Sequence, residues 1–180
     1  QENMVFFKNR ILDLLDIYVE KLVKSSSTSG SMNDEWYVCL SMASPLLDLM
    51  GLTLNGDLRD KAHKLLKKLV KVKVVLSKDH LGEPTEEGEE WFVNVDSLFN
   101  MLGSIHEEIG DASTAALFAA YSQYSLYLSK ILIGYDSNNV DKVVDVYTES
   151  MKQWIKSKNS KINGSMFFDL INYFSSFKQK

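Results

Sequence analysis

The stretch GDLRDKAHKLLKKLVKVK, residues 56–73, decides the fold class of this chain. Its apolar residues recur every three or four positions, which is the spacing of one face of an α-helix. They are Leu58, Ala62, Leu65, Leu66, Leu69 and Val72. We expect Lys61, Lys64, Lys68 and Lys71 on the opposite face, because they follow the same spacing. The pattern predicts an amphipathic helix over residues 57–75 that hides its leucines against neighbouring helices.

The same helical spacing extends over most of the remaining sequence. It predicts further helices at residues 3–24, 34–50, 95–109, 112–133, 140–156 and 165–177. Pro45 is expected to kink the second of these or to start a new turn in it. With only two prolines and nine glycines, the chain lacks the turn signals of an all-β protein. We therefore predict an all-α fold of about seven helices.

Short polar connections between such helices favour antiparallel packing of neighbours. The expected architecture is a stack of helical hairpins, as in HEAT or armadillo solenoids, and an irregular helical bundle is the alternative. We expect residues 1–180 to form a single helical-repeat domain. Because the chain begins with Gln1, we interpret it as a fragment of a longer protein.

Two polar runs are predicted to be flexible loops, residues 25–33 and residues 78–90. The first is rich in serine, and the second combines Gly82, Pro84 and Gly88 with several glutamates. These glutamates are irregularly spaced for a calcium loop, so we interpret them as a solvated charge run. They are Glu83, Glu86, Glu87, Glu89 and Glu90.

The composition restricts the possible functions. Hydrophobic residues make up 45% of the chain and charged residues 24%, which is typical of a folded soluble protein. The single cysteine, Cys39, allows neither an intrachain disulfide nor a thiolate metal site. No apolar run approaches the roughly 18 residues of a membrane span, so we expect no membrane partner.

No motif for catalysis, metal binding or cofactor binding is recognisable. The sequence His106-Glu107-Glu108 lacks the second histidine of a zinc protease motif, and no glycine-rich phosphate loop occurs. The helical spacing of the tyrosines and tryptophans favours core packing over base stacking. We therefore predict no catalytic residue, no metal site and no cofactor.

Lysine clusters are the best candidates for a binding site. One cluster lies in and around the predicted helix at 57–75 and comprises Arg59, Lys61, Lys64, Lys67, Lys68, Lys71 and Lys73. A second follows near the end of the helix at 140–156 and comprises Lys152, Lys156, Lys158 and Lys161. Repeated amines can contact successive phosphates of a nucleic acid. The alternative is a solvated helix face, and for the second cluster, stabilisation of a helix C-terminus.

Two properties argue against strong sequence-specific binding by these clusters. Lysine outnumbers arginine in them, and lysine lacks the planar fork of donors with which arginine binds base edges in a bidentate manner. The net charge of −4 is also unlike that of a dedicated nucleic-acid domain. The nucleic-acid hypothesis further requires that the lysines point outward and are not bound by carboxylates of the same chain.

Three stretches resemble a known family. They are FFKNRILDLLDIYVEK at 6–21, GDLRDKAHKLLKKLVKVK at 56–73 and VDVYTESMKQWIKSKNSKINGSMFFDLINYF at 144–174. The last is the most specific, because it combines Val146-Tyr147, Ile155, Lys158-Asn159-Ser160-Lys161 and Met166-Phe167. Together they resemble the C-terminal region of the DNA polymerase phi family. This family is also called the Myb-binding protein 1A family and, in fungi, DNA polymerase V.

The resemblance implies a non-catalytic nucleolar scaffold in ribosome biogenesis and ribosomal RNA gene transcription. The implied partners are ribosomal RNA or ribosomal DNA, together with ribosome assembly factors or the RNA polymerase I machinery. The implied location is the nucleus and nucleolus. Despite the family name, we do not expect a polymerase, because two-metal catalysis needs closely placed carboxylates and the sequence shows no such motif. The alternative is a protein-protein interaction scaffold that binds no nucleic acid through this chain.

Overall fold

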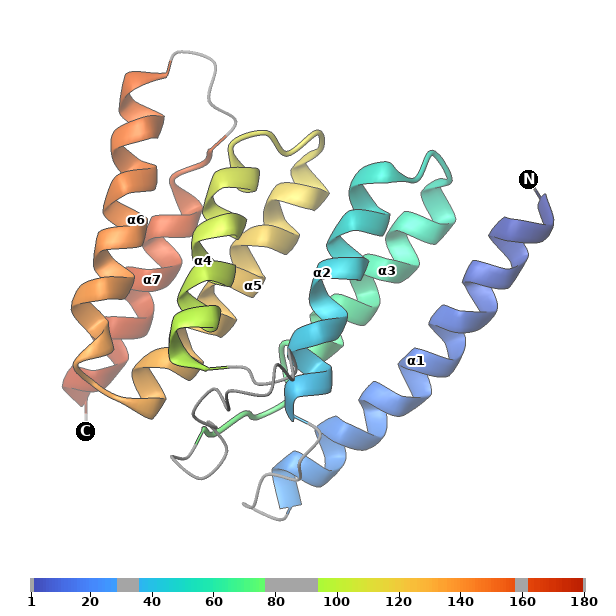
Figure 1. The fold of residues 1–180 in the computed structure, drawn as a ribbon, viewed down its shortest axis with the longest axis horizontal. Coiled ribbons are helices and arrows are strands. Elements are labelled where there is room, and N and C mark those ends of the chain that lie inside the picture. The colour runs from blue at the N-terminus through green and yellow to red at the C-terminus, as the bar shows by residue number, and fades with distance from the viewer. Residues whose placement is uncertain (1, 29–35, 77–93, 158–161, 180) are drawn as a thin grey trace, which may run out of the picture. The chain divides into compact units, whose positions relative to one another are not determined.

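A computed structural model of the chain describes residues 2–28, 36–76, 94–157 and 162–179. Within these ranges it contains seven α-helices, one short 3-10 helix and no strand (Figure 1). The helices are α1 (Glu2–Thr28), α2 (Trp36–Leu52), α3 (Gly56–Leu69), α4 (Val95–Ile109), α5 (Ala115–Tyr135), α6 (Asn139–Lys156) and α7 (Ser165–Ser175), followed by η2 (Ser176–Gln179). The predicted all-α class is confirmed. No described helix combines the length and apolar character required to cross a membrane.

The chain divides into two compact units, Gln1–Leu76 and Ser77–Lys180. In the first unit, α3 is the central element, because α1 and α2 both pack against it (Figure 1). The predicted apolar face of α3 is buried as expected: Leu58, Ala62, Leu65, Leu66 and Leu69. The α2–α3 pair is an antiparallel hairpin, whereas α1 and α3 run in the same direction.

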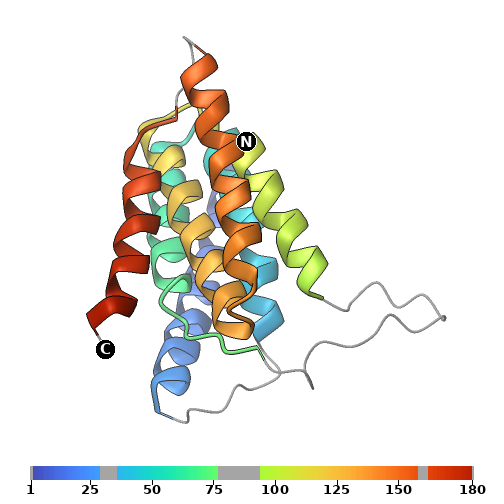
Figure 2. The ribbon, with the colours of Figure 1, turned by 90° about the vertical axis from the view of Figure 1, so that its left-hand side faces the viewer.

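In the second unit, α5 contacts α4, α6 and α7, and α4 also packs beside α6 (Figure 2). A buried polar network joins three of these helices. The two ring nitrogens of His106 each lie 2.7 Å from a serine hydroxyl, that of Ser150 in α6 and that of Ser125 in α5. Ser125 also shares a hydrogen bond of 2.7 Å with the hydroxyl of Tyr147. The network satisfies polar groups that would be costly to bury alone.

Helix boundaries follow local capping where the caps are strong. α4 has the predicted bounds because the Asn94 side chain accepts from the Ser97 backbone N–H, and the Ser97 hydroxyl accepts from the Asn94 backbone N–H. α2 passes through Pro45 without a break in the helix. α3 ends at Leu69 and not at the predicted residue 75, because Lys71 N–H bonds to Lys68 O and begins a turn.

The first predicted loop differs from the structure in its opening residues. Residues 25–28 continue α1, and the hydroxyls of Ser25 and Ser26 donate to the carbonyls of Leu22 and Val23. These bonds place the serine side chains against the helix that precedes them. The remainder of that loop, 29–33, and the acidic run at 78–90 lie outside the described residues. The single-domain organisation of residues 1–180 stays a prediction.

Candidate nucleic-acid interface

The lysines of α3 fall into two sets with different surroundings. Lys61 and Lys68 lie on the flank of α3 that faces α1, whereas Lys64 and Lys67 lie on the exposed side. The sequence pattern placed Lys61, Lys64, Lys68 and Lys71 together on a solvent face. The structure separates them because α1 packs beside the leucine face of α3 and covers one of its flanks.

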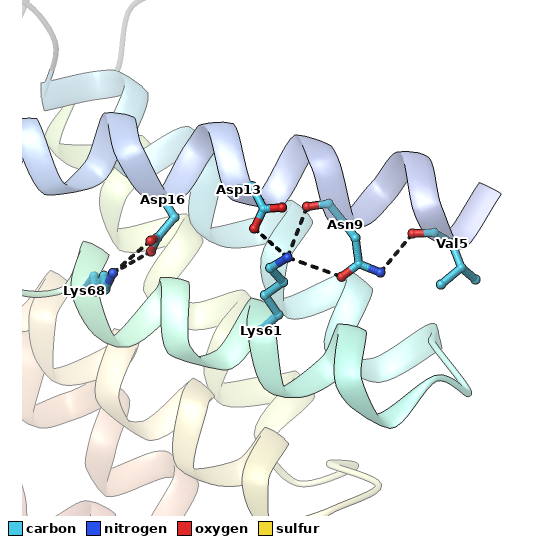
Figure 3. Close-up of polar contacts among 6 residues, drawn as sticks. All are labelled: Val5, Asn9, Asp13, Asp16, Lys61 and Lys68. Carbon is cyan, nitrogen blue, oxygen red and sulfur yellow. Dashed lines mark hydrogen bonds and ion pairs between the residues drawn. The ribbon is translucent and has the colours of Figure 1, made fainter. Parts of the chain in front are cut away.

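Lys61 is bound by groups of α1 (Figure 3). Its Nζ lies 2.5 Å from an Asp13 carboxylate oxygen, and it also donates to the backbone carbonyl and side-chain oxygen of Asn9 at 3.4 and 3.5 Å. The Asn9 amide is oriented by donating to Val5 O at 3.0 Å. Ion pairs as exposed as Lys61–Asp13 contribute about 0.2–1 kcal/mol to stability. The Lys61 ammonium is therefore engaged by groups of α1.

Lys68 is bound by two carboxylates of α1. Its Nζ lies 2.7 Å from Asp16 and 2.9 Å from Glu20. The hydrogen bonds that Lys68 donates to Asp16 and to Glu20, in this order of effect, raise the pKa of Lys68 above its ordinary value. A phosphate at this position would have to compete with two carboxylates for the same ammonium group.

Arg59 has a structural contact of its own. Its guanidinium donates to the backbone carbonyl of Thr53 at 2.8 Å, which ties α3 to the connection that precedes it. Its Nε is buried without a hydrogen-bond partner. The same connection holds the cap of α3, where the Asn55 side chain accepts from Leu58 N–H at 2.8 Å. Arg59 therefore presents only part of its donor set to solvent.

Four lysines remain available: Lys64, Lys67, Lys71 and Lys73. All four are exposed, and their ammonium groups form no ion pair within the ranges that the structure describes. Lys64 and Lys67 lie on α3, while Lys71 and Lys73 follow its end. We refer to these four residues as the open lysines. They form a short run of exposed lysines along one segment of the first unit.

The second predicted cluster lies on α6 in the other unit. Lys152 pairs weakly with Glu149 at 3.4 Å, one helical turn before it, and both side chains are largely exposed. Lys156 is exposed in the last turn of α6, where its positive charge also interacts favourably with the helix dipole. Lys158 and Lys161 lie outside the described residues.

The acidic residues of α1 were missed as part of this site by reasoning from the sequence. The signal is present, since Asn9, Asp13, Asp16 and Glu20 follow each other at spacings of four, three and four. In the structure this polar stripe of α1 faces complementary groups of α3. The sequence does not say that the stripe faces α3. Among the described residues, no group of three or more histidine, cysteine, aspartate or glutamate side chains could hold a metal ion.

Comparison with known proteins fits this arrangement of stacked helices. A family model described as Myb-binding protein 1A-like, TPR repeats, matches residues 33–178. The chain belongs to the Myb-binding protein 1A-like family. The resemblance found in the three sequence stretches is thereby confirmed. The match covers α2 to α7, whereas the three carboxylates that bind Lys61 and Lys68 all lie on α1, which precedes the matched residues.

One relative of this Myb-binding protein 1A-like chain is the rDNA transcriptional regulator POL5 of Saccharomyces cerevisiae. The two are 31% identical over 195 residues, which cover 99% of the chain. The chain spans only 17% of the length of that relative. No solved structure matches the chain. The family description names TPR repeats, which, like HEAT and armadillo repeats, are stacked helical pairs.

Proposed function

We propose that this Myb-binding protein 1A-like chain is a non-catalytic scaffold segment that acts in ribosomal DNA transcription. The proposal follows the name of the yeast relative, an rDNA transcriptional regulator, and the helical-repeat fold. Its place of action would be the nucleus, and more narrowly the nucleolus. Its partners would be ribosomal RNA or ribosomal DNA, assembly factors and the RNA polymerase I machinery.

The open lysines carry the nucleic-acid part of the proposal. Four exposed ammonium groups that have no ion pair among the described residues can each neutralise a phosphate and release a counterion. Lys152 and Lys156 on α6 would add a second contact, extended by Lys158 and Lys161. Arg59, Lys61 and Lys68 would support the site by holding α3 in place, since their side chains bind groups of the chain itself.

Salt-dependent binding tests the proposal with matched variants. Fluorescence anisotropy of the whole chain is measured with a labelled DNA duplex and an RNA hairpin over a series of salt concentrations. The Lys64→Gln/Lys67→Gln variant should reduce the slope of log affinity against log salt by about 1.8 for the duplex. The Lys61→Gln/Lys68→Gln variant loses the same charge but should leave the slope nearly unchanged. Lys152→Gln/Lys156→Gln tests the second cluster in the same way.

A scaffold that binds only proteins is the second candidate. The ion pairs of Lys61 and Lys68 favour it, because they remove two central charges from the predicted site. The net charge of −4 favours it too. This candidate would be supported if both lysine variants kept the salt slope of the unmodified chain, or if neither nucleic-acid probe bound. Metal-dependent incorporation of nucleotides by the purified chain would contradict the non-catalytic assignment.

A further inference from the structure

An apolar stripe on α1 is left uncovered in the first unit. Met4, Phe7, Ile11 and Leu14 follow each other at spacings of three, four and three, and their exposed fractions are 59%, 60%, 40% and 68%. This alternation is the pattern by which one helix packs against another. Four large side chains in a row are more than the scattered exposure that a soluble surface tolerates without a partner. We call these four residues the α1 stripe.

The α1 stripe borders an apolar groove between α1 and α2. The two helices both pack on α3, and between them they leave a groove of about 420 Å³. Ile11 and Leu15 line it from α1, and Met42, Pro45 and Leu49 line it from α2. Because Ile11 belongs to both features, stripe and groove form one continuous apolar surface on a single unit.

The charges beside this surface have one dominant sign. Helical periodicity puts Lys8, which also lines the groove, on one side of the α1 stripe and Arg10 on the other, with Lys21 on the Arg10 side about two turns past the end of the stripe. The acids of α1 are turned away from it, since Asp13 and Asp16 bind the lysines of α3 (Figure 3). The only charged residue of α2 is Asp48. A ligand with negative charges beside its own apolar stripe would complement the basic residues of α1.

We propose that the α1 stripe and the adjoining groove dock an amphipathic α-helix of a partner protein whose apolar face is flanked by glutamate or aspartate. The spacing of the stripe selects a helix, the groove takes its large apolar side chains, and Lys8, Arg10 and Lys21 select acidic flanks. A second copy of this chain fits less well, because two α1 stripes would bring like charges together.

A pair of designed peptides tests this docking site on the whole 180-residue chain. Both peptides are helices of about 20 residues with leucines at alternating spacings of three and four. One carries glutamates beside the leucines and the other carries lysines. The glutamate peptide should bind at least about fivefold more tightly in fluorescence anisotropy, and added salt should reduce the difference.

Matched variants locate the binding surface. Phe7→Glu and Leu14→Glu should each weaken binding of the glutamate peptide by at least about tenfold. Ile155→Glu is the control, because Ile155 is a 74% exposed apolar residue in the other unit and should leave the affinity unchanged. Circular dichroism should show unchanged helicity in all three, since the substituted side chains are exposed in the structure.

Several results would overturn the proposal. Equal binding of the two peptides would indicate unspecific adhesion, and undiminished binding by Phe7→Glu would place the site elsewhere. If sedimentation equilibrium showed that the unmodified chain is a dimer and that Phe7→Glu is a monomer, the occupant of the surface would be a second copy of the chain. The nucleic-acid proposal is tested separately, because the α1 stripe variants leave every open lysine in place.

Discussion

The ammonium of Lys68 lies 2.7 Å from the carboxylate of Asp16, a residue 52 positions earlier in the chain. This ion pair, with Lys61–Asp13 beside it, ties α3 to α1 along one flank. The α1 carboxylates thus neutralise two lysines of a cluster that would otherwise be a longer basic surface. The division into bound and open lysines leads to the first prediction.

Removal of the α1 carboxylates should enlarge the basic surface. In the Asp13→Asn/Asp16→Asn variant, Lys61 and Lys68 lose most of their intramolecular charge partners. We expect tighter binding of an RNA hairpin or DNA duplex and a salt slope steeper by up to about 1.8. Asp141→Asn/Asp145→Asn is the control for net charge, since both residues are exposed on α6. If both variants changed the slope equally, the effect would be one of net charge alone.

The leucine face of α3 should dominate the stability of the first unit. Leu66 is completely buried, so Leu66→Ala should lower the free energy of unfolding by about 2–5 kcal/mol. Leu54→Ala removes the same atoms from a side chain that is 99% exposed. It should change the free energy of unfolding by less than about 0.5 kcal/mol. Urea titration followed by circular dichroism measures both. A small loss for Leu66→Ala would contradict the central place of α3.

His106 should make stability depend on pH in the second unit. Its side chain is 4% exposed, and burial lowers its pKa from 6.5 to about 4. Since the unfolded chain binds the proton more readily, stability falls as pH drops from 6.5 toward 4 and levels off below that. The loss between pH 8 and pH 5 should be about 2 kcal/mol.

Urea titrations at several pH values measure this dependence. In His106→Gln the loss attributable to the imidazole should disappear, while the titration of carboxylates remains in both proteins. The difference in stability between the two proteins should therefore shrink as the pH falls from 7 to 5. A difference that stays constant over this range would show that His106 titrates normally.

Much of the fold could be predicted because apolar periodicity and capping act within a few residues of the chain. The first residue of α4, for example, is set by the capping box of Asn94 and Ser97, three residues apart in the chain. The end of α3 was misplaced because Val72 and Leu76 remain buried after the helix ends. Apolar spacing reports burial, and here burial continues through a turn and a non-helical segment.

The candidate site was harder to predict because it depends on which helices meet. Lys61 and Lys64 look equivalent in the sequence, three positions apart on one amphipathic helix. Only the packing of α1 against α3 distinguishes them, by placing Asp13 beside Lys61 and leaving Lys64 exposed. The spacing of the α1 stripe is likewise the same whether or not another helix covers it, so the sequence alone does not show that these residues are exposed.

Lysine footprinting tests the central claim most directly. The chain is treated with an amine-acetylating reagent, with and without an RNA hairpin or DNA duplex, and each lysine is quantified by mass spectrometry. We predict that Lys64, Lys67, Lys71 and Lys73 react readily and become protected by the nucleic acid, while Lys61 and Lys68 react slowly in both conditions. Unchanged reactivity of the four open lysines at saturating nucleic acid would contradict the account.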